Sequence, residues 1–215
     1  MTRKIKLGMR LIRYSLDLKG NIAIMVLFTI LGIFWFFITE MGQFGPIYLA
    51  IVGVYVHQML NSLQYSNMVL SSSREKELQL SVILLINSLC VFIYYILTIL
   101  VSVLDWKLFH QEGYSFRNLV VFGGVSMLMM IYEVLWPKLG TIMVFISMFA
   151  VFIPVFLAYT DSGSRLLEGI SLGAGVGISL AEILLGAVLQ YLAARLTYRL
   201  PVNNKLMLAK FQKVR

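Results

Sequence analysis

Charged side chains are scarce in this chain: Asp, Glu, Lys and Arg make up 13% of its 215 residues, whereas hydrophobic residues make up 60%. Soluble domains carry charge on about a quarter of their residues. Because so few charges cannot cover so much apolar surface in water, lipid is the expected solvent for most of the chain. No polar stretch is long enough for a separate soluble domain, so we expect one membrane domain over 1–215.

Residue types that carry catalysis or bind metals are scarce as well. Cys90 is the single cysteine, which excludes an internal disulfide and a cysteine-based metal cluster. The two histidines, His57 and His110, form no His-Glu-x-x-His motif, and the chain has no Walker A motif. Residues 123–126 contain a Gly-x-Ser element, but small residues in membrane helices commonly serve packing. We therefore expect no catalytic residue, metal site or cofactor in this chain, and no ATP hydrolysis by the chain alone.

Long apolar runs are what the chain has in abundance. Six of them lie near 22–39, 46–64, 79–104, 118–136, 139–159 and 170–195. Each has about 18 residues or more, enough to cross a hydrocarbon core of about 30 Å at 1.5 Å per residue. The sequence thus predicts an all-α membrane protein with six transmembrane helices. Pro137 is expected to break the helix between the fourth and fifth spans.

The second run is the least certain span, because its second half is polar. Its polar residues are His57, Gln58, Asn61, Ser62 and Gln64. Of these, His57 and Asn61 are candidates for a substrate path through the membrane.

The N-terminal segment 1–20 has the pattern of a helix lying on the membrane surface. Its apolar residues recur at helical spacing, and its basic residues form an adjacent row: Ile5, Met9, Ile12 and Leu16, then Lys6, Arg10 and Arg13. Such a helix keeps its apolar face at the acyl boundary and its basic residues at the headgroups. Gly20-Asn21 is the expected break before the first span, which we interpret as retained and not as a cleaved signal peptide.

Lysine and arginine are distributed unevenly between the two sides that six spans define. Fifteen lie on one side, namely six in 1–21, two in 65–78, Lys138, and six in 195–215. The other side has three: Lys107, Arg117 and Arg165. Because basic residues collect on the cytoplasmic side, both termini and the 65–78 loop are expected there, with 196–215 as a basic tail.

The same distribution has two further consequences. The net charge of +8 is a topology signal, so nucleic acid is not an expected partner. The outer side receives loops at 40–45, 105–117 and 160–169, with aromatic residues suited to an interfacial belt at Trp106, Tyr114 and Phe116.

Glu182 falls near the middle of the sixth span. A charge in hydrocarbon is costly, so this side chain should face the bundle interior or a water-filled cavity, or be protonated. One interpretation is a contact with substrate or a proton. The other is structural: a hydrogen bond to Gln190, His57 or Asn87, or a neutral acid in packing.

The sixth span also carries small residues every fourth position, at Gly169, Gly173, Gly177 and Ala181. Such a row lets two helix backbones approach closely. The expected partner is another helix of the same chain or a second protomer. The glycines would also permit a broken helix over 163–177.

The longest polar patch lies between the second and third spans, in the predicted cytoplasmic loop. Its residues are Ser71, Ser72, Ser73, Arg74, Glu75, Lys76, Glu77 and Leu78. A serine followed by a glutamate three or four residues later is typical of a capping box, which predicts a short exposed helix. This helix could dock a partner ATPase, or it could be a helical turn in a solvated loop.

Taken as a whole, the chain resembles the permease subunits of type-2 ABC transporters, most closely those of small bacterial peptide exporters for phenol-soluble modulins and bacteriocins. In this resemblance Met9–Leu18 corresponds to the connecting helix, Ser71–Gln79 to the coupling helix, and the glycine-rich segment to the outer approach to span six. It implies a homo- or heterodimer of permeases in the bacterial plasma membrane, a peptide substrate, and separate ATPase subunits that hold ATP and Mg²⁺.

Two other functions fit the same residues. One is an ion- or proton-coupled small-molecule carrier that uses Glu182. The other is a non-transporting peptide-immunity protein of the membrane.

Overall fold

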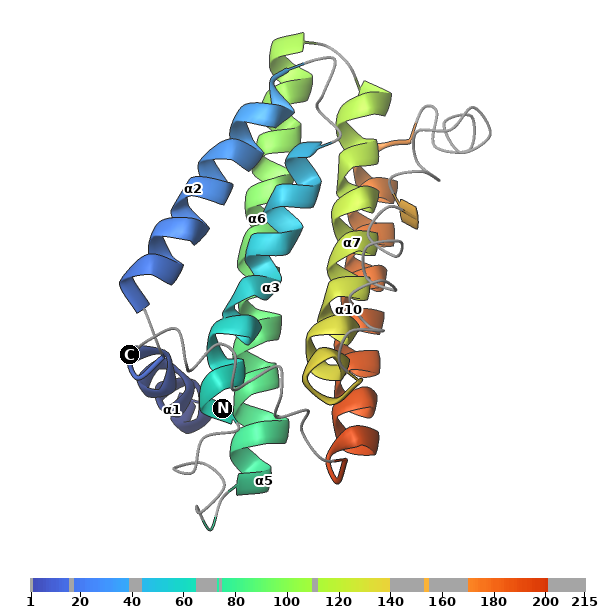
Figure 1. The fold of residues 1–215 in the computed structure, drawn as a ribbon. Helices are drawn as coiled ribbons and strands as arrows, with labels where there is room; N and C mark the ends of the chain where they lie inside the picture. Colours follow the sequence, from blue (N-terminus) through green and yellow to red (C-terminus); the bar gives the residue numbers. More distant parts are fainter. Residues whose placement is uncertain are drawn as a thin grey trace.

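The computed structural model is a bundle of long helices (Figure 1). It describes residues 2–15, 18–38, 44–64, 73, 75–109, 112–139, 153–154 and 170–200. These residues form helices and turns and contain no strand. The prediction of an all-helical chain is therefore confirmed for this part of the sequence.

Four helical segments are long and apolar enough to cross a membrane. They are α2 (Leu18–Phe36), the π-helical η1 (Leu78–Val82) together with α6 (Ile83–Phe109), α7 (Glu112–Leu139) and α10 (Leu172–Thr197). They correspond to the first, third, fourth and sixth predicted runs. The fifth run, 139–159, lies outside the described residues except at Leu139 and 153–154.

Helix α3 (Phe44–Gln64) contains the second predicted run and packs against α2, α6 and α7 at the centre of the bundle. Leu49, Ala50, Val54 and Leu60 are completely buried. Only its first part, Phe44–His57, is continuously apolar, shorter than a full span. Of the polar residues in its second half, the side chain of His57 is described, and at 1% exposure it meets protein instead of lipid.

The outward faces of the peripheral helices are strongly apolar. Large exposed hydrophobic residues include Ile22, Val26, Leu27, Ile30 and Phe34 on α2, Ile93, Leu100 and Leu104 on α6, and Leu184, Leu185, Val188 and Leu192 on α10. A folded chain in water would bury such faces. Their exposure on three long helices fits a protein surrounded by lipid.

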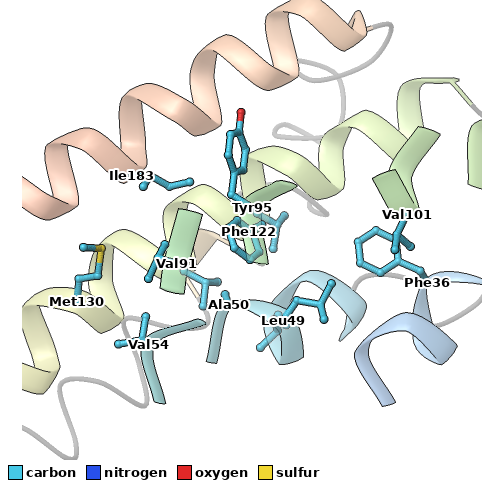
Figure 2. Close-up of a cluster of buried hydrophobic side chains, with 13 residues drawn as sticks. Phe36, Leu49, Ala50, Val54, Val91, Tyr95, Val101, Phe122, Met130 and Ile183 are labelled. Carbon is cyan, nitrogen blue, oxygen red and sulfur yellow. The ribbon is translucent and has the colours of Figure 1, made fainter. Parts of the chain in front are cut away.

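A cluster of buried side chains from α2, α3, α6, α7 and α10 forms the main core (Figure 2). At its centre the ring of Tyr95 stacks on that of Phe122, with centroids 6.1 Å apart. The Tyr95 hydroxyl points toward α10 and donates a hydrogen bond to the carbonyl of Val176 at 2.7 Å. The hydroxyl of Ser179 donates to Tyr95 at 3.1 Å, so polar contacts tie α6 to α10 inside the apolar core.

The N-terminal helix α1 (Thr2–Arg13) is shorter than the predicted 1–20. The expected break at Gly20-Asn21 is wrong, because α2 begins at Leu18 and contains both residues. Asn21 instead joins two helices: the Tyr55 hydroxyl of α3 donates to its side-chain oxygen at 3.0 Å. This bond gives Asn21 a tertiary role that a local turn signal does not reveal.

Helix α1 lies at the end of the bundle where α6 begins, and it contacts α3, η1 and α6 (Figure 1). The prediction placed Ile5, Met9, Ile12 and Leu16 on a single apolar face; Leu16 lies outside the described residues, and the other three differ in burial. Ile5 and Ile12 pack on the bundle, whereas Met9 is 55% exposed. The innermost residues are Gly8 and Leu11, because only glycine lets the α1 backbone come so close to α6.

We expect Gly8→Leu to detach α1 from the bundle. A Cβ at Gly8 would overlap the Ile86 side chain and lie 3.4 Å from Val82 Cγ1. The predicted loss of stability is about 1–3 kcal/mol, as for overpacking in a core. Hydrogen exchange of the 2–13 amides, followed by mass spectrometry, should become faster. The control is Met9→Leu on the exposed face; unchanged exchange in Gly8→Leu would contradict the docked position.

Two predicted boundaries are wrong at the ends of α6 and α7. Most of the expected loop 105–117 is helical, since α6 runs to Phe109 and α7 starts at Glu112. Trp106 and Phe116 lie together there, with ring centroids 5.8 Å apart, and this packing supports the extra turns. Helix α7 also continues through Pro137 to Leu139. Pro137 has no N–H to donate to the carbonyl four residues earlier, and the described part of α7 ends two residues after it.

Candidate functional site

The predicted docking segment lies at the same end of the bundle as α1 (Figure 1). Ser73 is an exposed turn residue, and the three-residue helix α5 (Glu75–Glu77) follows, with Lys76 and Glu77 exposed. Ser71, Ser72, Arg74 and the side chain of Glu75 lie outside the described part, so the capping box is not tested. The visible portion is thus a short charged helical turn that faces outward.

Leu78 turns inward directly after these charges. It packs in a buried cluster with Leu11 of α1 and Leu60 of α3. The exposed charged turn is therefore followed directly by Leu78, which packs at the junction where α1, α3 and α6 meet.

The junction begins with η1, a π-helical turn that the sequence pattern did not predict. Its residues Leu78, Gln79, Leu80 and Val82 are buried. Single π-helical turns within α-helices occur frequently at functional sites. Hydrophobic periodicity does not predict such a turn, because the spacing argument assumes the α-helical period of 3.6 residues throughout. Here η1 connects α5 to α6 without an intervening loop, so a displacement of α5 must move the start of α6.

Glu182 lies at the contact between α10 and α7. Its Oε1 would be 3.7 Å from a Cβ placed on Gly124, and its Oε2 lies where a Cβ on Gly123 would be. Oε2 is buried and has no hydrogen-bond partner in the described part of the chain. The two glycines therefore make the space that the carboxyl group occupies.

A second group of buried polar side chains lies nearer the α5 end of the bundle. His57, Asn87 and Gln190 come from α3, α6 and α10, and at most 1% of each is exposed. Gly53 packs against Val91 across antiparallel α3 and α6, so His57 and Asn87, one turn further along each helix, lie at one level. Ala194 packs against Leu84, which brings Gln190 to the same level.

This polar layer has few hydrogen bonds. His57 Nδ1 and both side-chain polar atoms of Asn87 and of Gln190 have no partner among the residues that the structure describes. Buried polar groups normally have partners, and exceptions call for a specific explanation. The side chain of Asn61, the remaining predicted path residue, lies outside the described part.

The structure shows none of the three hydrogen bonds that the structural interpretation named for Glu182, while a neutral acid in packing stays a prediction. Gln190 follows it by eight residues on α10, which is about 12 Å along a helix at 1.5 Å per residue. His57 and Asn87 share the level of Gln190. None of the three is bonded to Glu182 in the described part, so the predicted path residues fall at two separate levels.

The packing face of α10 is also different from the predicted one. Among the described residues, no atom lies within 4 Å of a Cβ placed on Gly173 or Gly177, and both glycines are exposed. As a contact with the described helices, this row is therefore wrong, while a contact with a second protomer stays a prediction. Gly169 lies outside the described residues. The buried face contains Gly175, Ser179, Ile183, Gly186, Gln190 and Ala194.

The reason for this difference is that two rows of small residues run along α10, and spacing alone cannot tell them apart. In the buried row, Ser179 bonds to Tyr95 of α6, and Gly186 packs against Met127 of α7. A row that mixes glycine with Ser179 and Gln190 is a weaker sequence signal than regular glycines, yet it is the one that packs.

Comparison of the chain with protein families, with curated proteins and with solved structures gave no match. The class that the fold defines is a helical membrane protein: its long apolar helices expose apolar faces and bury their polar residues. A more specific function has to be argued from the junction around α5 and from the polar residues inside the bundle, which lie at two levels. One level holds Glu182, and the other holds His57, Asn87 and Gln190.

Proposed function

We propose that the chain is the permease subunit of an ATP-driven type-2 ABC exporter in a bacterial plasma membrane, with both termini in the cytoplasm and six spans. The exporter moves amphipathic or hydrophobic peptides out of the cell. The observation that carries this proposal is the junction at one end of the bundle. There an exposed charged turn, α5, continues directly into the π-helical start of α6, and α1 packs across that start.

The proposed mechanism transmits motion through this junction. Partner ATPase subunits bind ATP and Mg²⁺ and dock on Ser71–Leu78. When the ATPases close, α5 moves; since η1 leaves no loop between α5 and α6, the displacement passes into α6. Buried contacts of Leu78 with Leu11 and Leu60 pass it on to α1 and α3. Substrate crosses between this chain and a second permease, by way of His57, Asn61 and Glu182.

The basic residues support the proposed orientation. Arg3, Lys6, Arg10 and Arg13 of α1 are exposed at the end of the bundle that holds α5. The end of α7 is tied to the end of α10 nearby, because Lys138 Nζ donates to the Leu200 carbonyl at 2.8 Å. Basic residues that the charge count assigns to one side thus gather at one end, as the cytoplasmic side requires.

Replacing Arg74 to Glu77 by glycine should abolish copurification with a partner ATPase. Glycine removes the charges and lowers helix propensity by about 1 kcal/mol per residue, so the docking surface is lost while the buried Leu78 remains. Affinity purification from native membranes measures the complex. Lys107→Gln, at the opposite end of α6, is the matched control and should retain it. If no ATPase copurifies with the native chain, the exporter proposal fails.

The second candidate is an ion- or proton-coupled carrier, which the absence of a described hydrogen-bond partner for Glu182 Oε2 favours. It predicts transport in proteoliposomes without any ATPase. It also predicts loss of that transport in Glu182→Gln, whereas replacing Arg74 to Glu77 would leave it intact.

A further inference from the structure

The described helices around the carboxyl group of Glu182 carry no lysine or arginine near its level. The sequence has no lysine or arginine between Arg165 and Arg195. The same holds between Arg117 and Lys138 on α7 and between Lys76 and Lys107 on α6. Arg195 follows Glu182 by 13 residues, about 20 Å along the helix. The same described helices of a second copy would also present no lysine or arginine at this depth.

Glu182 is placed where a group from outside the bundle can reach it. Ser179 and Gly186, close to one turn away on either side, are buried against α6 and α7. Ile178 and Leu185, on the other flank, are 42% and 51% exposed. Glu182 itself is half-buried, so it lies at the border between the packed face of α10 and the outward face.

On the α7 side, two glycines border the carboxyl group of Glu182. Gly123 and Gly124 offer only backbone on the α7 side, and Pro154 packs 3.0 Å from a Cβ placed on Gly124. The Ser126 hydroxyl, one turn along α7, is buried and has no partner in the described part of the chain. Glu182 Oε2 is thus a buried carboxyl oxygen that packs on the glycines of α7 and has no partner in the described part of the chain.

A charged group within a membrane is stable when it is paired. We propose that Glu182 binds a cationic group of the transported peptide, an ammonium or a guanidinium, which enters along the border between α10 and α7. The inference rests on the proposed function and names the chemical class of substrate: an amphipathic peptide with basic residues. The apolar part of such a peptide would lie against the exposed residues of α10 that flank Glu182.

Site-resolved chemical labelling tests this proposal on the full chain in nanodiscs of neutral lipid, without an ATPase. Dicyclohexylcarbodiimide, an apolar reagent, modifies unpaired carboxyl groups that are reachable from lipid, and mass spectrometry identifies the residue. The probe is a helical amphipathic peptide with lysines on its polar face. At about ten times its Kd the peptide should lower labelling of Glu182 about tenfold, because it then occupies most sites.

The matched control is the same peptide with every lysine acetylated, which removes the charge and keeps the apolar face. We expect it to leave labelling of Glu182 unchanged. Equal protection by both peptides would overturn the proposal, because it would indicate apolar coverage without charge recognition. Failure of the lysine peptide to protect, or absence of labelling in the peptide-free protein, would overturn it as well.

Two variants keep the test independent of folding. Glu182→Asp retains the carboxylate and should still bind the lysine peptide, while Glu182→Gln should weaken its Kd about tenfold and leave the acetylated peptide unaffected. Equal affinity in Glu182→Gln would contradict the proposal. Because no ATPase is present, these outcomes are separate from copurification: a complex without protection would refute the cation site alone, and protection without a complex would refute the exporter alone.

Discussion

Replacing Gly186 by leucine should lower the free energy of unfolding by about 3 kcal/mol, the upper part of the range for overpacked cores. A Cβ at this position would lie 2.8 Å from Met127 Cα and 3.2 Å from Met127 Cβ. The nearest atom belongs to the backbone of α7, so no rotamer change can make room. Helices α7 and α10 would have to separate, which would also weaken the bond between Ser179 and Tyr95.

Gly177→Leu on the same helix is the matched control. Among the described residues, no atom is within 4 Å of a Cβ there, so the variant should unfold within about 0.5 kcal/mol of the parent. Thermal unfolding in detergent, followed by circular dichroism, measures both. Equal destabilisation of the two variants would contradict the assignment of the packed face. If a second protomer covers the outer row, Gly177→Leu should lower the dimer fraction without affecting the monomer.

Gln190→Met should raise the stability of the folded chain by about 1–3 kcal/mol, the usual cost of a buried polar group without a partner. Gln190 is completely buried, and both its amide nitrogen and its amide oxygen have no bond among the described residues. Methionine has a similar length and can fill the same space without polar atoms. The same reasoning applies to Asn87→Leu at the same level of the bundle.

Ser179→Ala provides the contrasting case. The Ser179 hydroxyl bonds to Tyr95 at 3.1 Å and to the Gly175 carbonyl at 2.7 Å, so its removal should cost about 0.6 kcal/mol. Unfolding in mixed micelles with increasing SDS compares the variants. A destabilised Gln190→Met would show that the amide is bonded in the folded protein. A stabilised variant with reduced transport would indicate that the polar layer is retained for function at a cost in stability.

The sequence was sufficient to predict helices in the segments that lipid is expected to surround. Backbone groups in hydrocarbon must bond within their own segment, so long apolar runs have to be helices. The runs at 22–39, 79–104, 118–136 and 170–195 therefore appear as helices, with ends that differ by a few residues. The second run, whose second half is polar, forms part of α3, where the described side chain of His57 is buried by protein.

The sequence was not sufficient where two faces of one helix compete. Glycines at 173 and 177 have the more regular spacing, yet Gly175 and Gly186 are the ones that pack. Helix α1 gave a similar result, because its closest contact uses Gly8, a residue outside the predicted apolar face. Which face packs depends on the shape of the neighbouring helix, and that shape is not encoded in the spacing of one segment.

The sequence alone thus indicated lipid as the solvent of this protein, its helical class and the level of each polar residue in its own helix, because these follow from transfer energies and a fixed rise per residue. Only the tertiary structure decided which polar residues of different helices lie at the same level of the bundle. It joined His57, Asn87 and Gln190 into one layer, and it placed Glu182 apart from them against Gly123 and Gly124. The physical reason is that the register between helices is set by close contacts of small residues on different segments, which no single segment contains.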